Sequence, residues 1–489
     1  MMRGRPRRGG WRVVSVVAAR GVILGAAMLL GACTVGPDYV KPSVEVPTTY
    51  KEVDGWKVAE PRDQTLRGDW WERFSEPRLS ALEAQVDISS QSVAAAEAQL
   101  RQAHALVQAA RSSYFPTISV GVGLTRVRTS ATLSDGSINA GRTTTILQLP
   151  IDISWELDLW GRIRRSVESA RAGAAASAAD LESARLSVRA ELAQDYFLLE
   201  SLDADRRLLD ETVADYERSL QLTRNRYASG VVARADVLRA ETQLKTTQAQ
   251  AIDVGVQRAQ LEHAIAVLLG RPASTFGLPA SPLAGTPPDI PVGLPAELLE
   301  RRSDVAGAER RVAAANAQIG VAVAAYYPTV TLSAGGGLES GSVAHWLTWP
   351  SRFWSVGPGI SQTVFDGGLR GAQTDQARAT YDATVAGYRQ TVLTAFKEVE
   401  DNLAALRILQ NEAGVQDEAV SDARQVVTVT TNQYRAGTVS YLDVVVAQAT
   451  ALDNERAAVD LRGRRMVAAV LLVKALGGGW TASDSDAAR

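Results

Sequence analysis

Two long stretches without proline constrain the fold of this chain more than any other feature of its sequence. They run from Ile151 to Arg271 and from Gly359 to Arg489, and both are rich in residues that favour helices. Apolar residues recur at steps of three and four, as at Val188, Leu192, Tyr196 and Leu199. This sustained spacing predicts long helices packed as coiled coils. A helix from about Arg162 to Tyr227 would be roughly 100 Å long, which is longer than a compact domain needs.

The chain also repeats itself. The segment Tyr114–Ile118 returns with small changes as Tyr326–Val330, 212 residues later, and Arg226–Gly230 returns as Gln433–Gly437, 207 residues later. These matches predict an internal tandem repeat of two halves, each about 200 residues long. A proline-rich segment between the halves, residues 271–296, can be neither helix nor central strand, so we expect an ordered crossover there.

Each half contains two segments in which apolar and polar residues alternate. In the clearest of them, Ile151–Asp158, every second residue is polar. The others begin near Ile118, Val330 and Trp354. Such alternation predicts strands with one apolar face and one face toward water.

The number of strands bears on the oligomeric state. Two strands in each half make four in each chain, and about eight is the smallest number that closes a membrane barrel. Eight strands from two chains would enclose only side chains, whereas three chains would leave a pore. We therefore predict a mainly α fold with β, in which a trimer forms a 12-stranded membrane β-barrel that continues into a long α-helical barrel. The mature chain has no apolar run of about 18 residues, which a membrane-spanning helix would need.

The only cysteine, Cys33, follows an arginine-rich start and a short apolar run, Gly21–Leu30. This order, with small residues before the cleavage site, is typical of a secretory signal peptide. The string Leu30–Cys33 resembles a bacterial lipobox, in which the cysteine is acylated and becomes the first mature residue. A chance cysteine after an ordinary signal peptide is the alternative. Thr34 follows, rather than the aspartate that often retains such lipoproteins at the inner membrane, so the resemblance favours the outer membrane.

These features divide the chain into six segments. They are a signal peptide (1–32), an acylated extended segment with an equatorial region (33–76), the first structural repeat (77–270), the proline-rich crossover (271–296), the second structural repeat (297–477) and a C-terminal tail (478–489). We expect the first repeat to contain a helix, two strands and two long helices.

No residues form a recognisable catalytic, cofactor-binding or metal-binding pattern, so we do not expect an enzyme. The three histidines, His104, His263 and His345, are isolated, and the glycine runs lie in strand patterns rather than at phosphate-binding turns. The formal net charge of -2 does not favour nucleic acid as a partner. The one expected covalent group is the lipid on Cys33. A structural coiled-coil lipoprotein is the alternative, but it leaves the strands and the repeat unexplained.

Five motifs carry a resemblance that covers essentially the whole chain. They are CTVGPDYVKP (33–42), GDWWERF (68–74), WELDLWGR (155–162), GLPAELLERRSD (293–304) and FDGG (365–368). Together they resemble the TolC superfamily and, within it, the NodT-type (OprM-like) lipoprotein branch of outer-membrane efflux factors. The chain departs from the family pattern at Ser303, where the family usually has proline.

The resemblance implies a homotrimer that serves as the outer-membrane channel of a tripartite efflux pump and exports small molecules to the exterior. Its expected partners are a periplasmic adaptor (membrane-fusion) protein, an inner-membrane pump of the resistance-nodulation-division (RND) type and the lipid of the outer membrane. The outer-membrane duct of an ABC-type peptide or protein secretion system is the alternative.

The resemblance also assigns roles to the two turns between the long helices. Asp443, Tyr434 and Asp236 would line a periplasmic aperture, and Asp443 would form a ring of three carboxylates that attracts cations. The family's second aperture aspartate and its gate arginine correspond to Val446 and Val439, so neither is present here. The adaptor would dock on the turn residues Gly230, Val231, Val232, Ala233, Gly437 and Thr438.

The residues by themselves support a simpler interpretation of these turns. Gly230 and Gly437 are placed to end a helix in the left-handed conformation. Asp236 and Asp443 lie at the start of the following helices, where a carboxylate caps the helix and meets the positive end of its dipole. For Asp236 this capping role is the favoured interpretation, and a role in the aperture is the alternative.

Overall fold

The computed structural model of the protein describes residues 34–52, 69–132, 141–283, 285–290 and 301–478. The predicted signal peptide, Cys33, part of the crossover and most of the C-terminal tail lie outside these residues. The chain divides into two compact units. The sheet unit comprises Met1–Pro42, Gln102–Ala174 and Arg310–Ala386, and the helical unit comprises Ser43–Arg101, Ala175–Glu309 and Gly387–Arg489.

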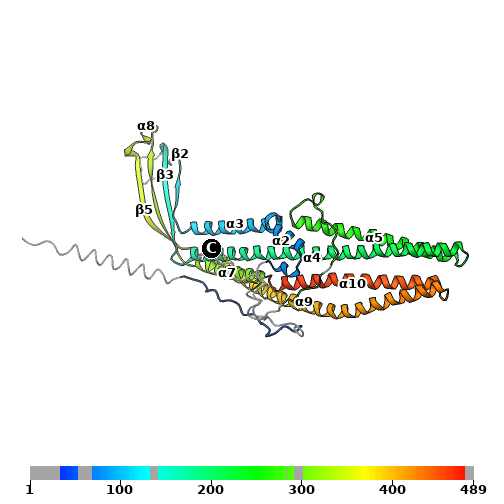
Figure 1. Cartoon of the computed structure of the whole chain (residues 1–489). Helices are drawn as coiled ribbons and strands as arrows, with labels where there is room; N and C mark the ends of the chain where they lie inside the picture. The colour runs from blue at the N-terminus through cyan, green and yellow to red at the C-terminus, as the bar shows by residue number, and fades with distance from the viewer. Residues whose placement is uncertain (1–33, 53–68, 133–140, 284, 291–300, 479–489) are drawn as a thin grey trace, which may run out of the picture. The chain divides into compact units, whose positions relative to one another are not determined.

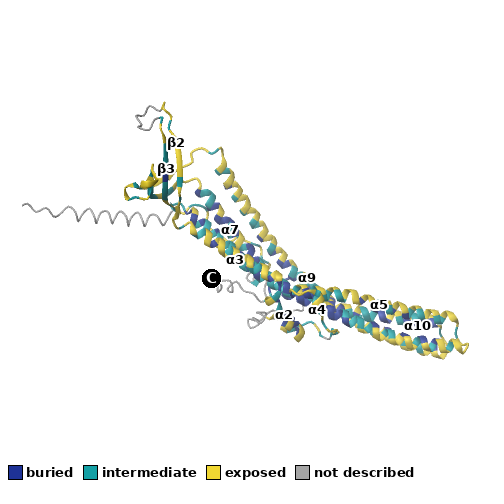
Figure 2. Ribbon diagram, turned by 90° about the horizontal axis from the view of Figure 1, so that it is seen from above, coloured by how far each residue is buried: buried dark blue, intermediate teal, exposed yellow. Residues whose placement is uncertain are grey.

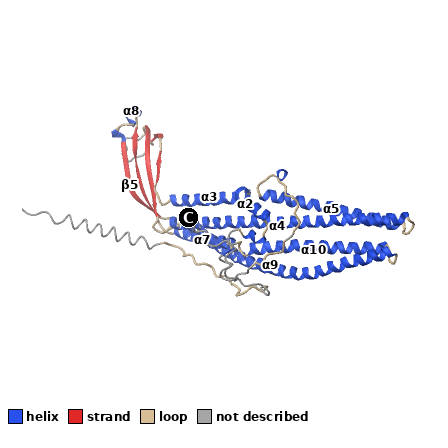
Figure 3. Ribbon diagram, in the orientation of Figure 1, coloured by secondary structure: helices blue, strands red, loops and turns tan. Residues whose placement is uncertain are grey.

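Helices make up most of the described chain (Figures 1 and 3). The α-helices are α2 (Pro77–Ser89), α3 (Gln91–Ser112), α4 (Arg162–Ala228), α5 (Arg234–Leu268), α7 (Ser303–Ala324), α8 (Val343–Trp346), α9 (Leu369–Ala436) and α10 (Tyr441–Ala475). Short 3-10 helices are η2 (Trp70–Phe74), η3 (Ala273–Thr275) and η4 (Trp349–Ser351). The strands are β1 (Thr117–Val120), β2 (Gly123–Arg128), β3 (Thr143–Leu157), β4 (Thr329–Ser340) and β5 (Arg352–Ser361).

The long helices predicted from the proline-free stretches are confirmed. Helix α4 has 67 residues and α9 has 68, and each is followed by a helix of 35 residues. The apolar positions that set the predicted period are buried, with Val188 7% exposed and Leu192 fully buried. Figure 2 shows that buried positions recur along these helices while exposed ones cover the rest of their surface. Among the described residues, no helix is both long and apolar enough to span a bilayer.

The sheet is antiparallel, and it differs from the prediction in one respect. Its order is β1-β3-β4-β5, and β2 also pairs with β3. The single strand expected to begin near Ile118 is therefore divided into β1 and β2, although both follow one continuous register, from Thr117 opposite Ser154 to Arg128 opposite Thr143.

Pro150 explains the division. It lies in β3 opposite Gly121, whose N–H donates to the Pro150 carbonyl at 3.0 Å. Proline has no N–H to donate in return, so the ladder lacks one bond there. On the other side of β3, Pro150 faces Gly337 of β4. A Cβ at Gly337 would lie 2.1 Å from the carbonyl oxygen of Leu149, so this close approach requires glycine.

The register sorts the strand residues onto two different faces. One face is apolar over most of its length, and its members include Ile118, Val120, Leu124, Leu147, Leu149, Ile151, Ile153, Trp155, Val330, Leu332, Leu338, Trp354, Val356 and Ile360. The other carries small and polar residues, including Thr117, Ser119, Gln148, Asp152, Ser154, Glu156, Thr331, Ser333, Glu339 and Ser355. The apolar face is uncovered within the chain, since Val120 is 67% exposed and Trp354 is 77% exposed.

Local contacts explain two of the sequence motifs. In WELDLWGR, Asp158 accepts hydrogen bonds from the backbone N–H groups of Ile163 and Arg164 in the first turn of α4, at 2.9 and 2.8 Å. In FDGG, Asp366 accepts a hydrogen bond from the N–H of Gly368 just before α9, at 3.1 Å. A carboxylate at the N-terminus of a helix satisfies donors that have no partner within it and meets the positive end of the dipole.

The segment that follows Cys33 is held against the sheet unit. The N–H of Val35 donates to the Trp160 carbonyl at 3.1 Å, and Asn316 donates to the Pro37 carbonyl at 3.0 Å. The buried Arg165 forms an ion pair with Asp38 at 2.8 Å. Residues 34–38 therefore lie next to the first turn of α4, at the end of the sheet where β3 meets its helix.

Candidate functional site

The two turns predicted to carry function join α4 to α5 and α9 to α10, and both lie in the helical unit. Gly230 has a φ of +73° and Gly437 a φ of +77°. The N–H groups of Val231 and Thr438 donate back to the carbonyls of Arg226 and Gln433, at 2.9 and 3.0 Å. These are Schellman caps, as expected from the glycines. No atom lies within 4 Å of a Cβ built at either glycine, so the backbone conformation rather than space demands glycine.

A compact apolar cluster supports both turns. Its buried members come from all four long helices and are Tyr216, Leu220, Ala240, Leu244, Tyr434, Tyr441 and Val444. The rings of Tyr434 and Tyr441 lie 5.3 Å apart. Val232 and Val439 pack partly against the cluster from the two turns. The turns are thus held together by packing between residues more than 200 positions apart in sequence.

Arg226 adds a polar link between the two turns. Its Nη1 donates to the carbonyl of Tyr434 at 2.9 Å, and its guanidinium lies 4.5 Å from the centre of the Tyr434 ring. Such a cation–π contact combined with a hydrogen bond suits the planar guanidinium. Tyr434 itself is only 4% exposed. In the single chain, Tyr434 therefore contributes to the core beneath the turns, and its side chain does not face solvent.

Asp443 is exposed and caps α10. It forms a capping box with Ser440, whose backbone N–H and hydroxyl both donate to Asp443 Oδ2, at 2.9 and 2.7 Å. The Ser440 hydroxyl and backbone hydrogen bonds lower the pKa of Asp443 below its usual value. The carboxylate is therefore charged at neutral pH and remains accessible.

The capping role favoured for Asp236 is wrong. Helix α5 begins after Ala233, which has no side-chain acceptor, and no side-chain cap forms there. Asp236 lies in the first turn and forms an ion pair with Arg239 at 2.9 Å. The difference from Asp443 has a simple cause, because a capping box needs serine or threonine at the N-cap and only α10 has one, in Ser440.

The residues predicted to receive the adaptor lie on the surface of the turns. Gly230, Val231, Ala233, Gly437 and Thr438 are exposed, and Val231 is 62% exposed. Val232 is half-buried against the cluster. The two turns thus present a small, partly apolar surface whose backbone is fixed by two caps.

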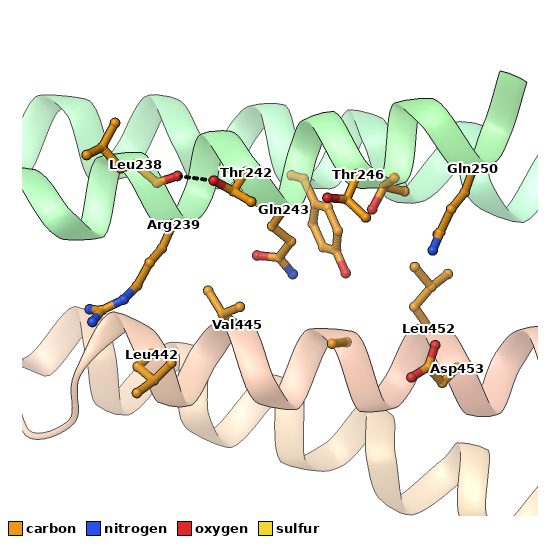
Figure 4. A pocket seen from close by; sticks show the side chains of 13 residues that line it. Leu238, Arg239, Thr242, Gln243, Thr246, Gln250, Leu442, Val445, Leu452 and Asp453 are labelled. Carbon is orange, nitrogen blue, oxygen red and sulfur yellow. Dashed lines mark hydrogen bonds between the residues drawn. The ribbon is translucent and has the colours of Figure 1, made fainter.

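A groove runs between α5 and α10 beside these turns (Figure 4). It has a volume of about 450 Å³. Its lining includes Leu238, Arg239, Gln243, Leu442, Val445 and Asp453. Gln243 donates to Gln448 across the two helices at 3.3 Å. The groove offers apolar side chains between a basic and an acidic residue.

Two features of this site escaped the sequence analysis. The capping box at Ser440 follows the pattern of a hydroxyl residue three positions before a carboxylate, so it was detectable from sequence. The contact between Arg226 and Tyr434 left no local signal, since it joins residues far apart in the chain.

The fold is that of the TolC-superfamily outer-membrane channels. The solved structure of the outer-membrane channel OprN has 32% sequence identity to this chain and a TM-score of 0.84, and the match covers 92% of this chain and 100% of that one. The open state of the Neisseria gonorrhoeae MtrE channel has 27% identity and a TM-score of 0.79, with 92% and 99% covered.

A family model described as outer membrane efflux protein matches residues 83–271 and 294–478, and the chain belongs to this family. Curated relatives agree. The outer membrane protein OprJ of Pseudomonas aeruginosa is 31% identical over 471 residues, which cover 93% of this chain and 94% of the relative. The solvent efflux pump outer membrane protein SrpC of Pseudomonas putida is 30% identical over 463 residues, which cover 94% and 98%.

Proposed function

We propose that this chain is the outer-membrane channel component of a tripartite efflux pump, and that it carries small molecules from the periplasm or an inner-membrane pump to the exterior. The observation that carries the proposal is the sheet, which has one uncovered apolar face, one polar face and two edges left unpaired within the chain. The family supports the same function, and the relative SrpC is named as part of a solvent efflux pump.

Closure by three copies explains the open sheet. Backbone groups at a free strand edge have no partner in a lipid bilayer, so a spanning sheet must close on itself. If β1 and β2 act as one strand, each chain supplies four strands and three chains supply the twelve that leave a pore. The apolar face then meets lipid, and Asp152 and Ser154 on the polar face line the pore.

Acylation of Cys33 would anchor the same end of the sheet to the membrane. Residues 34–38 are bound to the first turn of α4 and to α7, so a lipid on the preceding cysteine lies close to the helix end of the sheet. This places the helix end at the periplasmic leaflet and the long helices in the periplasm. A second anchor of this kind adds to the barrel's own hold on the membrane.

The aperture is proposed at the turns of the helical unit. Asp443 is exposed and charged, and three copies of it around one axis would attract cations and repel anions. Asp236 is partly neutralised by Arg239, so it contributes less to such a ring. Since valines occupy positions 439 and 446, the closed state depends on packing and on the Arg226 contact rather than on a latch at those positions.

The partners of the proposed channel are a periplasmic adaptor at the exposed turns and an inner-membrane RND pump. Crosslinking in the native envelope, purification of the full-length protein and mass spectrometry test this directly. Recovery of an adaptor with an RND pump is the expected result. Recovery with an ABC transporter instead would favour peptide or protein secretion and contradict efflux.

A matched pair of variants locates the docking surface. Val231→Glu places a charge on the exposed α4–α5 turn, and we expect it to lower adaptor recovery at least about fivefold. Val415→Glu makes the same change at an exposed position of α9, far along the chain from either turn, and should leave recovery unchanged. Equal recovery with both variants would contradict docking at the turns.

A further inference from the structure

Three arginines lie on the apolar face of the sheet, at the end away from the helices. Arg126 and Arg128 follow Leu124 on that face of β2, and Arg352 opens β5 on the same face, opposite Leu338. All three are exposed. Among the described residues, none of them forms an ion pair, and Arg352 lies 4.4 Å above the ring of Trp349. The proposed barrel does not by itself explain cations on a face that meets lipid.

The chain's own repeat predicts how two copies of the sheet join. The span Thr117–Arg128 and strand β4, Thr329–Ser340, match at a shift of 212 residues. Their partners match at a shift of 207, since Thr117 pairs with Ser154 and Thr329 pairs with Ser361. These are the two shifts already found in the sequence, so the pairing of strands repeats as the residues do.

The joint between β3 and β4 inside the chain therefore serves as a template for the joint between copies. Leu147 pairs with Ser340, and the same two shifts turn this pair into Trp354 of one copy opposite Arg128 of the next. Leu149 and Leu338 likewise become Val356 opposite Arg126. The transferred register keeps the apolar faces of the copies on one side, whereas a slip of one residue would reverse them.

This register gathers all three cations at each joint. Arg128 lies directly opposite Trp354 of the next copy, about 5 Å away across the strands, and Arg352 of that copy lies diagonally, at about 7–8 Å. The acidic residues on the described parts of the strands, Asp152, Glu156 and Glu339, belong to the polar face. The site is thus basic, flanked by tryptophan, and incomplete without the second copy.

The depth of the site identifies the leaflet. The apolar positions of β3 run from Leu147 to Leu157, which is roughly 33 Å along the strand and about 25 Å across a membrane at the usual tilt. Arg126 and Arg128 lie just beyond this band, at the level of lipid headgroups. Because the anchored residues 34–38 lie at the opposite end of the sheet, the arginines face the outer leaflet.

We propose that each joint between copies binds the phosphorylated headgroup of an outer-leaflet lipid through Arg126 and Arg128 of one copy and Arg352 of the next. This inference rests on the proposed trimeric barrel. Guanidinium groups bind phosphate oxygens in a bidentate manner, and three unpaired cations at a lipid surface require such an anion.

Native mass spectrometry of the full-length protein in detergent tests the site, with diphosphoryl lipid A as the probe and lipid A without phosphates as the comparison. The wild-type trimer should retain up to three phosphorylated lipids and prefer them at least about tenfold. The triple variant R126Q/R128Q/R352Q should lose this preference. Arg142→Gln, a change at the same end of the sheet but outside the paired strands, should keep it.

Arg128→Lys serves as a milder variant, because it keeps the charge and removes the bidentate fork. We expect a threefold or greater loss of preference with the trimer intact, by the geometry of the guanidinium. Equal retention of both lipids by an intact trimer would overturn the site and leave the proposed function standing, whereas a chain that forms no trimer would overturn both. Displacement of the lipid by inorganic phosphate alone would also overturn the lipid site.

Discussion

At the scale of single residues, Asp443 combines a structural and an electrostatic role. Asp443→Asn keeps an oxygen that can accept the Ser440 hydrogen bonds and removes the charge. In a planar bilayer we expect the ratio of cation to anion permeability to fall at least about twofold. Asp236→Asn should change it less, because Arg239 already neutralises that carboxylate. Unchanged selectivity in Asp443→Asn would remove this residue from the aperture.

Glu83 makes stability depend on pH. It is fully buried in α2, neither of its carboxylate oxygens has a hydrogen-bond partner among the described residues, and burial raises its pKa to about 9. The folded state therefore holds a proton that the unfolded state releases above about pH 4.5. The stability contributed by protonated Glu83 is present below that pH and is lost progressively as pH rises toward 9.

Glu83→Gln should remove this dependence, since glutamine is neutral and similar in shape. At pH 7 we expect the variant to be more stable by about 1–3 kcal/mol, with little difference at pH 5. Thermal unfolding of both proteins across this range measures the effect. Glu97→Gln, which changes a partly exposed partner of Arg185, is the control. A pH-independent difference between wild type and Glu83→Gln would show that burial does not retain the proton.

At the scale of elements, glycine at position 337 permits β3 and β4 to pair around Pro150. A methyl group at Gly337 would collide with the carbonyl of Leu149, which belongs to the backbone and cannot turn away. Gly337→Ala should therefore destabilise the sheet by about 1–3 kcal/mol or more and lower the yield of folded protein. Gly357→Ala in β5 meets open space and should be tolerated. Heat-modifiable migration in SDS gels compares the two variants, and equal yields would contradict the close approach.

The long helices illustrate a different balance at the same scale. Their lengths follow from uninterrupted helix-forming residues, and their ends follow from Gly230 and Gly437. Their mutual placement at the turns depends on one cluster shared by four helices. A helix can thus be located from its own sequence, while its partner is chosen by packing.

At the scale of the whole molecule, the joint between copies can be tested without lipid. The template pair Gln148–Glu339 becomes Ser355 of one copy opposite Val127 of the next. A protein carrying Val127→Cys and Ser355→Cys should form disulfide-linked dimers and trimers on oxidation. The pair Thr125→Cys and Ser355→Cys is two residues out of register and should link poorly. Efficient linking only in the second pair would contradict the transferred register, and no linking in either would contradict the closed barrel.

Much of this protein was determined by sequence alone, because the relevant signals are local. The proline-free stretches set the long helices, alternation set the two-faced strands, and glycines set the ends of α4 and α9 through a backbone conformation that other residues avoid. The family followed from motifs that are themselves local caps and turns, as at Asp158 and Asp366.

Only the tertiary structure decided which of these local features meet. It buried Tyr434, joined Arg226 to it, showed Asp236 paired with Arg239 instead of capping α5, and divided the first strand at Pro150. It also bound residues 34–38 to α4 and α7. The physical reason is that each of these outcomes depends on a partner's position in space. Residues far apart in the chain come together through packing, and the periodicity of either segment carries no record of the other.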